Sequence, residues 1–89
     1  MLSITDLRDF IDLDHETVHV VISATRQAPD RAVEFARQLL ASRSGVTTLH
    51  HMFRDQIAEA EARRDHAREG ELRRAYAYFA RKYPIPQLN

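Results

Sequence analysis

Apolar residues recur at intervals of three and four positions along most of the chain, which is the spacing of one face of an α-helix. This spacing is clearest over residues 29–43 and over residues 47–62. The first stretch holds the apolar positions Ala32, Val33, Ala36, Leu39 and Leu40, with Phe35 alongside. The second holds Leu49, Phe53, Ile57 and Ala60, with Met52 alongside. The pattern predicts one amphipathic helix in each stretch.

The short connection between these helices predicts how they pack. Pro29 suits the first turn of the earlier helix, and Gly45 is expected to end it in a left-handed conformation. Thr47 or Thr48 is expected to cap the later helix. Because short connections join antiparallel neighbours, we predict a central antiparallel helical hairpin over residues 29–62.

Two further helices are predicted towards the N-terminus. Ser3 can cap a short one whose apolar positions are Leu7, Phe10 and Ile11. Asp14 can cap the next, whose apolar face holds Val18, Val21, Ile22 and Thr25. Residues 17–23 are rich in β-branched side chains and also fit a strand, but the capping signals and the lack of a partner strand favour a helix.

The C-terminal third alternates between charged and aromatic positions. Residues 59–74 hold several oppositely charged pairs at helical spacing: Glu59–Arg63, Glu61–Arg64, Asp65–Arg68, Glu69–Arg73 and Glu71–Arg74. They predict that the helix continues as a solvated extension, which Gly70 breaks or weakens. Leu72, Tyr76, Phe79 and Tyr83 then share one face of a final helical stretch, which Pro84 and Pro86 end.

Together these elements predict an all-α protein, a small bundle of four to five helices with that hairpin at its centre. We expect a single helical domain over residues 1–83 and an extended, proline-containing tail over 84–89. The chain has 89 residues, of which 44% are hydrophobic, so we expect a small core. Because a small core contributes little stability by itself, the sequence leaves open whether the protein forms a homodimer.

Composition narrows the function classes. The chain has no cysteine, which excludes disulfides, thiolate metal sites and a cysteine nucleophile. Its net charge is zero and no long apolar run is present, so we expect a cytoplasmic protein with no membrane partner and no strong attraction to nucleic acid.

One motif points to metal chemistry. His15-Glu16-Thr17-Val18-His19 has the form H-E-x-x-H and resembles the zincin metalloprotease helix, in which both histidines bind zinc and the glutamate is the general base. Glu16-x-x-His19 is also half of a carboxylate-bridged di-iron motif, which a homodimer would complete, with Glu34 as a further ligand. The alternative, which we favour, is a helix start with exposed polar side chains. Zinc or iron binding by His15, Glu16 and His19 therefore stays an alternative, and the expected protein has no cofactor.

The histidines at His50 and His51 do not predict a second metal site. Adjacent helical positions are about 100° apart, so their imidazoles cannot share one ion. We expect structural roles, with Met52 in the core and His51 paired to Asp55.

A basic and aromatic segment near the C-terminus is the strongest candidate binding site. Tyr78 lies off the apolar face and close to Arg74 and Lys82 at helical spacing. Tyrosine and arginine are enriched at the energetic centres of protein interfaces. The predicted partner-binding residues are Arg73, Arg74, Tyr78, Arg81 and Lys82.

The sequence thus predicts a non-enzymatic interaction module, a regulatory or accessory subunit whose partner is another protein. No complete catalytic set is present. A second alternative takes residues 17–23 as a strand, whose order with the following helices resembles a ribbon-helix-helix DNA-binding regulator.

Overall fold

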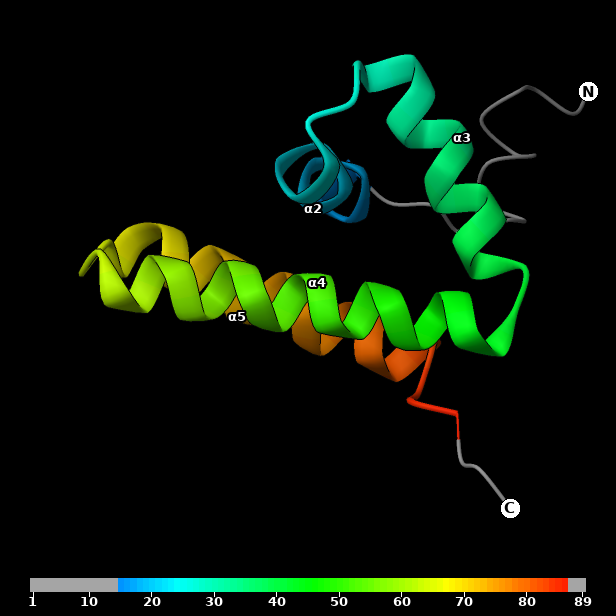
Figure 1. The fold of residues 1–89 in the computed structure, drawn as a ribbon. Helices are drawn as coiled ribbons and strands as arrows, with labels where there is room; N and C mark the ends of the chain where they lie inside the picture. Colours follow the sequence, from blue (N-terminus) through cyan, green and yellow to red (C-terminus); the bar gives the residue numbers. More distant parts are fainter. Residues whose placement is uncertain (1–14, 87–89) are drawn as a thin grey trace, which may run out of the picture.

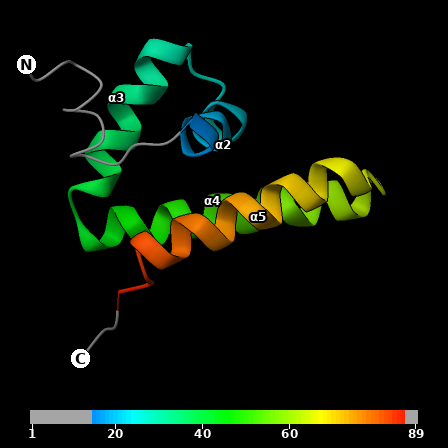
Figure 2. The same cartoon turned by 180° about the vertical axis from the view of Figure 1, so that it is seen from behind.

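The computed structural model describes residues 15–86, and within this range it contains four helices and no strand. The helices are α2 (His15–Thr25), α3 (Pro29–Leu40), α4 (Arg43–Ala62) and α5 (His66–Lys82). The predicted all-α class is confirmed, whereas the helix expected after Ser3 lies outside the described residues. Figures 1 and 2 show α4 and α5 side by side and antiparallel, with α2 and α3 lying over one side of this pair.

The ambiguous segment 17–23 lies inside helix α2. Val21 is buried as predicted, and Val18 and Ile22 pack against the core. Thr17 and Val20 are also buried, so the buried face extends further round the helix than the predicted one. The helix removes the strand that a ribbon-helix-helix arrangement requires.

The junction between α3 and α4 differs from the predicted one. Ser42, rather than Thr47 or Thr48, caps α4, because its side chain accepts a hydrogen bond of 3.0 Å from the Gly45 N–H. Gly45 therefore lies in the first turn of α4 and has no left-handed backbone. A Cβ at this position would clash with the backbone of Leu39, so glycine serves here to let the end of α3 approach α4.

The predicted hairpin over residues 29–62 is not confirmed, because α3 meets α4 at a steep angle (Figure 1). The antiparallel pair is α4 with α5, joined by residues 63–65.

The predicted continuous extension beyond Ala62 is wrong. Arg64 adopts a left-handed φ of 58°, and the N–H groups of Arg64 and Asp65 bond to the carbonyls of Glu61 and Ala60, which is a Schellman ending.

Helix α5 begins directly after this turn. The Asp65 side chain accepts from the Arg68 N–H and caps the helix. Gly70 lies inside α5 and does not break it. The predicted aromatic face is confirmed, since Leu72 and Phe79 are buried and Tyr76 and Tyr83 pack against the core.

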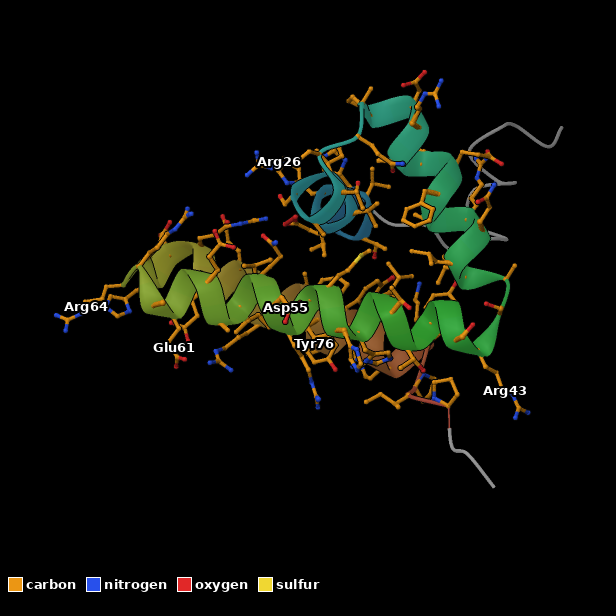
Figure 3. All side chains as sticks on the ribbon, viewed as in Figure 1. Arg26, Arg43, Asp55, Glu61, Arg64 and Tyr76 are labelled. Atoms are coloured by element: carbon orange, nitrogen blue, oxygen red, sulfur yellow. The ribbon has the colours of Figure 1, made fainter. Side chains whose placement is uncertain are left out.

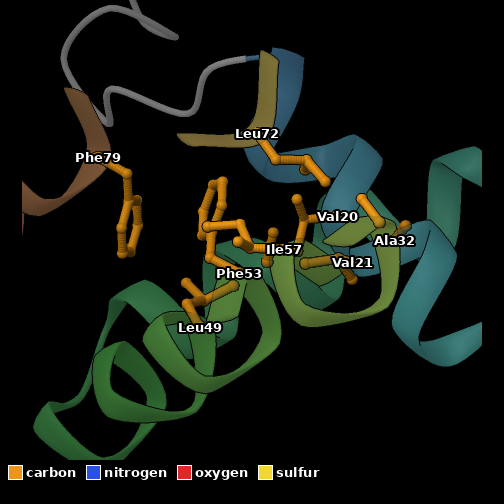
Figure 4. Close-up of a cluster of buried hydrophobic side chains, with 10 residues drawn as sticks. Val20, Val21, Ala32, Leu49, Phe53, Ile57, Leu72 and Phe79 are labelled. Atoms are coloured by element: carbon orange, nitrogen blue, oxygen red, sulfur yellow. The ribbon is translucent and has the colours of Figure 1, made fainter. Parts of the chain in front are cut away.

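One core joins all four helices (Figure 4). Phe53 on α4 is fully buried, and its ring lies 5.0 Å from that of Phe79 on α5, centroid to centroid. Met52 also packs against this core, as predicted. The buried hydrophobic residues are Val20, Val21, Ala32, Ala36, Val46, Leu49, Phe53, Ile57, Ala60, Leu72 and Phe79.

His50 fixes the end of α5 to α4. Its imidazole is 1% exposed and uses both nitrogens: Nε2 lies 2.6 Å from the Tyr83 carbonyl oxygen, and Nδ1 lies 2.8 Å from the Tyr76 hydroxyl. A carbonyl only accepts, so Nε2 carries the proton and donates, and in the neutral ring Nδ1 accepts from the tyrosine hydroxyl. The expected structural role of His50 thus takes the form of a polar clamp at the C-terminal end of α5.

Candidate functional site

The five predicted partner-binding residues all lie on α5, but the helix separates them onto two sides. Arg73 faces the side of α4, where its guanidinium lies 2.8 Å from Glu69 and 3.7 Å from Glu61. Arg74, Tyr78 and Lys82 follow one another at four-residue intervals on the other side. The structure therefore does not bring Arg73 together with the rest of the predicted site.

Tyr78 is the centre of the remaining group. It is 41% exposed, and Lys82 Nζ lies 4.5 Å from the centroid of its ring, a cation–π contact. Arg74 and Arg81 are exposed, and neither forms an ion pair with any residue between 15 and 86. We refer to Arg74, Tyr78, Arg81 and Lys82 as the Tyr78 surface.

An open groove of about 460 Å³ adjoins this surface, between α2 and α5. Ala75, Arg74 and Tyr78 line it from α5, together with Glu71. Glu16 lines it from α2. The groove thus offers a small apolar position and an aromatic ring, with charges of both signs around them.

One arginine links the two helices that form the groove. Arg68 Nη1 lies 3.2 Å from Glu71 and 3.6 Å from Glu16, so a single cation faces both carboxylates. Because Arg68 is 29% exposed at its side chain, water screens these pairs only in part. The link holds Glu16 beside Glu71, at the N-terminal end of the part of α5 that lines the groove.

Sequence reasoning missed Glu16, Glu71 and Ala75 as groove residues, and it missed Arg68 as the link between α2 and α5. The helical spacing places Glu71, Arg74, Ala75 and Tyr78 along one side of α5, which is a usable signal. No local pattern, however, relates Glu16 to a helix that begins fifty residues later.

The predicted pairs Glu59–Arg63 and Glu69–Arg73 are present, at 2.6 Å and 2.8 Å.

The H-E-x-x-H motif lies on α2, and its two histidines are neighbours while its glutamate pairs with Arg68. His15 and His19 are both exposed, with ring centroids 6.1 Å apart and planes inclined by 57°. Glu16 points instead towards Arg68. Among residues 15–86, no three side chains of the histidine, cysteine, aspartate or glutamate type converge in a way that would hold a metal ion.

None of the helices within residues 15–86 is both long enough and apolar enough to cross a membrane. Comparisons with protein-family models, with curated proteins and with solved structures returned no match to this chain.

Proposed function

We propose that this protein is an interaction module that binds another protein through the Tyr78 surface and the adjoining groove. The observation that carries the proposal is the exposed Tyr78 ring, which lies between Lys82 and the groove. Arg74 and Arg81 lie beside it and form no ion pair with any residue in the described range 15–86. A rigid aromatic ring next to cations is the side-chain combination typical of binding hot spots.

The charges around the groove favour a protein partner over nucleic acid. Glu16 and Glu71 line the groove, so the basic character of the Tyr78 surface does not continue into it as a phosphate-binding surface would require. A peptide segment can carry charges that complement both the positive and the negative side chains around the groove. It would place an apolar side chain above Ala75 and an acidic side chain near Arg74 or Arg81. The proposed partner therefore presents a mixed segment of this kind.

The fold supports a binding role because it holds α5 in a fixed position. The His50 clamp and the buried Phe79 hold α5 in place from its inner side, so its outer side is presented on a rigid helix. Preorganised surfaces lose less conformational entropy on binding.

The test is affinity isolation from the native host with the immobilised protein, followed by quantitative mass spectrometry. The double variant Tyr78→Ala, Arg74→Glu is compared with the control Arg54→Glu, which changes an exposed arginine on α4. We expect at least one protein that the wild type and the control retain equally and that the double variant loses by about 30-fold, the change that a loss of about 2 kcal/mol produces. Equal retention by all three proteins would contradict the proposal, and unchanged circular dichroism of the double variant excludes misfolding as the cause.

A further inference from the structure

We propose that His15 and His19 together chelate one divalent transition-metal ion on the outer face of α2. The proposal goes beyond the interaction module and does not depend on it. It assigns the metal to the two imidazoles alone and gives Glu16 no ligand role.

The geometry of α2 brings the two imidazoles onto one face. Residues four apart lie one helical turn from each other, and the ring centroids of His15 and His19 are 6.1 Å apart. Both side chains are exposed, so rotation about their side-chain bonds can turn one nitrogen of each ring towards a shared ion without moving the core. The helix thus supplies two neighbouring ligands on one face.

The surroundings leave these ligands available. Neither imidazole has a hydrogen-bond or ion-pair partner among residues 15–86. Their situation contrasts with that of His50, whose two nitrogens are both occupied within the core. Arg68 draws Glu16 away from the histidines, since its guanidinium lies 3.6 Å from that carboxylate.

The donor set determines which ions bind. Imidazole nitrogen suits copper, nickel and zinc, whereas magnesium and calcium prefer oxygen ligands. With two protein ligands of the same kind, affinity should follow the general order in which Cu²⁺ exceeds Ni²⁺. Water would fill the remaining coordination positions, so the site is open.

The experiment is isothermal titration of the full chain, without an affinity tag, with Ni²⁺. His15→Ala and His19→Ala are each compared with His51→Ala and His66→Ala, which remove exposed histidines that lie on other helices. We expect one Ni²⁺ per chain, an affinity at least tenfold weaker in each of the first two variants, and a change of less than twofold in the two controls. Glu16→Gln should also change the affinity by less than twofold, Cu²⁺ should bind more tightly than Ni²⁺, and Mg²⁺ should not bind.

Several outcomes would overturn this assignment. They are the absence of Ni²⁺ binding by the wild type, a loss caused by only one of the two histidine variants, and an equal loss in His51→Ala or His66→Ala. A loss in Glu16→Gln as large as in His19→Ala would replace it with a carboxylate-containing site. An unchanged circular dichroism spectrum and an unchanged urea midpoint for each variant establish that the helical fold is retained, so each of these outcomes reports on the site.

Discussion

At the scale of single residues, His50 shows how a polar side chain can serve a hydrophobic core. A buried imidazole without partners would be costly, because each lost hydrogen bond to water must be replaced. Here one replacement comes from the Tyr76 side chain on α5 and the other from the backbone of Tyr83, the residue directly after α5. The residue therefore ties two helices together through groups that neither helix satisfies by itself.

Replacing His50 by alanine should lower the free energy of unfolding by about 2–4 kcal/mol, because it leaves a cavity and removes the partners of a carbonyl and a hydroxyl group. Tyr76→Phe removes only the hydroxyl and should cost about 1 kcal/mol. Urea unfolding measures both changes. The control is His51→Ala, an exposed neighbour whose loss should change stability by less than about 0.5 kcal/mol. A His50→Ala effect no larger than this control would show that the clamp contributes no stability.

Helical spacing in the sequence predicted which side chains are buried. It did not predict which groups on other helices form hydrogen bonds or ion pairs with them. The spacing of Leu49, Phe53 and Ile57 identified the inner face of α4, and His50 shares that face because it follows Leu49 directly and precedes Phe53 by three positions. The partner groups lie on another helix, so helical spacing within one segment cannot reveal them. The Arg68 link to Glu16 was missed for the same reason.

At the scale of elements, both glycines lie inside helices. Gly45 was expected to end a helix and does not, whereas Gly70, which was expected to break or weaken one, does not break it. The actual break falls at Arg64, which takes the left-handed conformation that glycine or asparagine usually occupies. Helix propensity and charge pairing give no warning of such an ending, which explains why the extension beyond Ala62 was predicted and the α4–α5 turn was not.

Glycine-to-alanine substitutions should therefore have opposite effects at the two sites. Helix propensity alone favours alanine by about 1 kcal/mol at both. At Gly45 the added Cβ would clash with the Leu39 backbone, so we expect a net loss of about 2 kcal/mol or more. At Gly70 the nearest atom is Arg74 Nη1 at 3.4 Å, on a side chain that can move, so we expect a gain of up to about 1 kcal/mol.

Thermal and urea unfolding of the two alanine variants provide the measurement, and each variant serves as the other's control. A gain in stability for Gly45→Ala would mean that α3 does not approach α4 as closely as the structure describes. A loss for Gly70→Ala as large as that for Gly45→Ala would mean that α5 is not a regular helix at that position.

At the scale of the whole molecule, the single core predicts a single unfolding transition. Buried residues from all four helices form one cluster around Phe53, so no pair of helices has a separate core of its own. The arrangement with α2 and α3 over the α4–α5 pair was not evident from the sequence. Helical patterns specify which face of each element is buried, but they do not specify which neighbour covers it.

Phe53→Ala should cost about 3–5 kcal/mol, which is a large part of the roughly 4–13 kcal/mol expected for a chain of this length. Far-ultraviolet circular dichroism and tyrosine fluorescence should follow the same transition in the wild type, and both should shift together in the variant. Two separated transitions, with the α4–α5 pair persisting after α2 and α3 unfold, would contradict the single-core description.

The turn at residues 63–65 also makes the molecule convenient to label. The chain contains no cysteine, so Ala62→Cys at the exposed end of α4 would introduce its sole thiol. Figure 3 shows Glu61 and Arg64 at the opposite end of the α4–α5 pair from Arg43. At 1.5 Å per residue, Tyr78 lies about 20 Å along α5 from this turn. A dye attached there would lie far enough from Tyr78 to report binding without covering the Tyr78 surface.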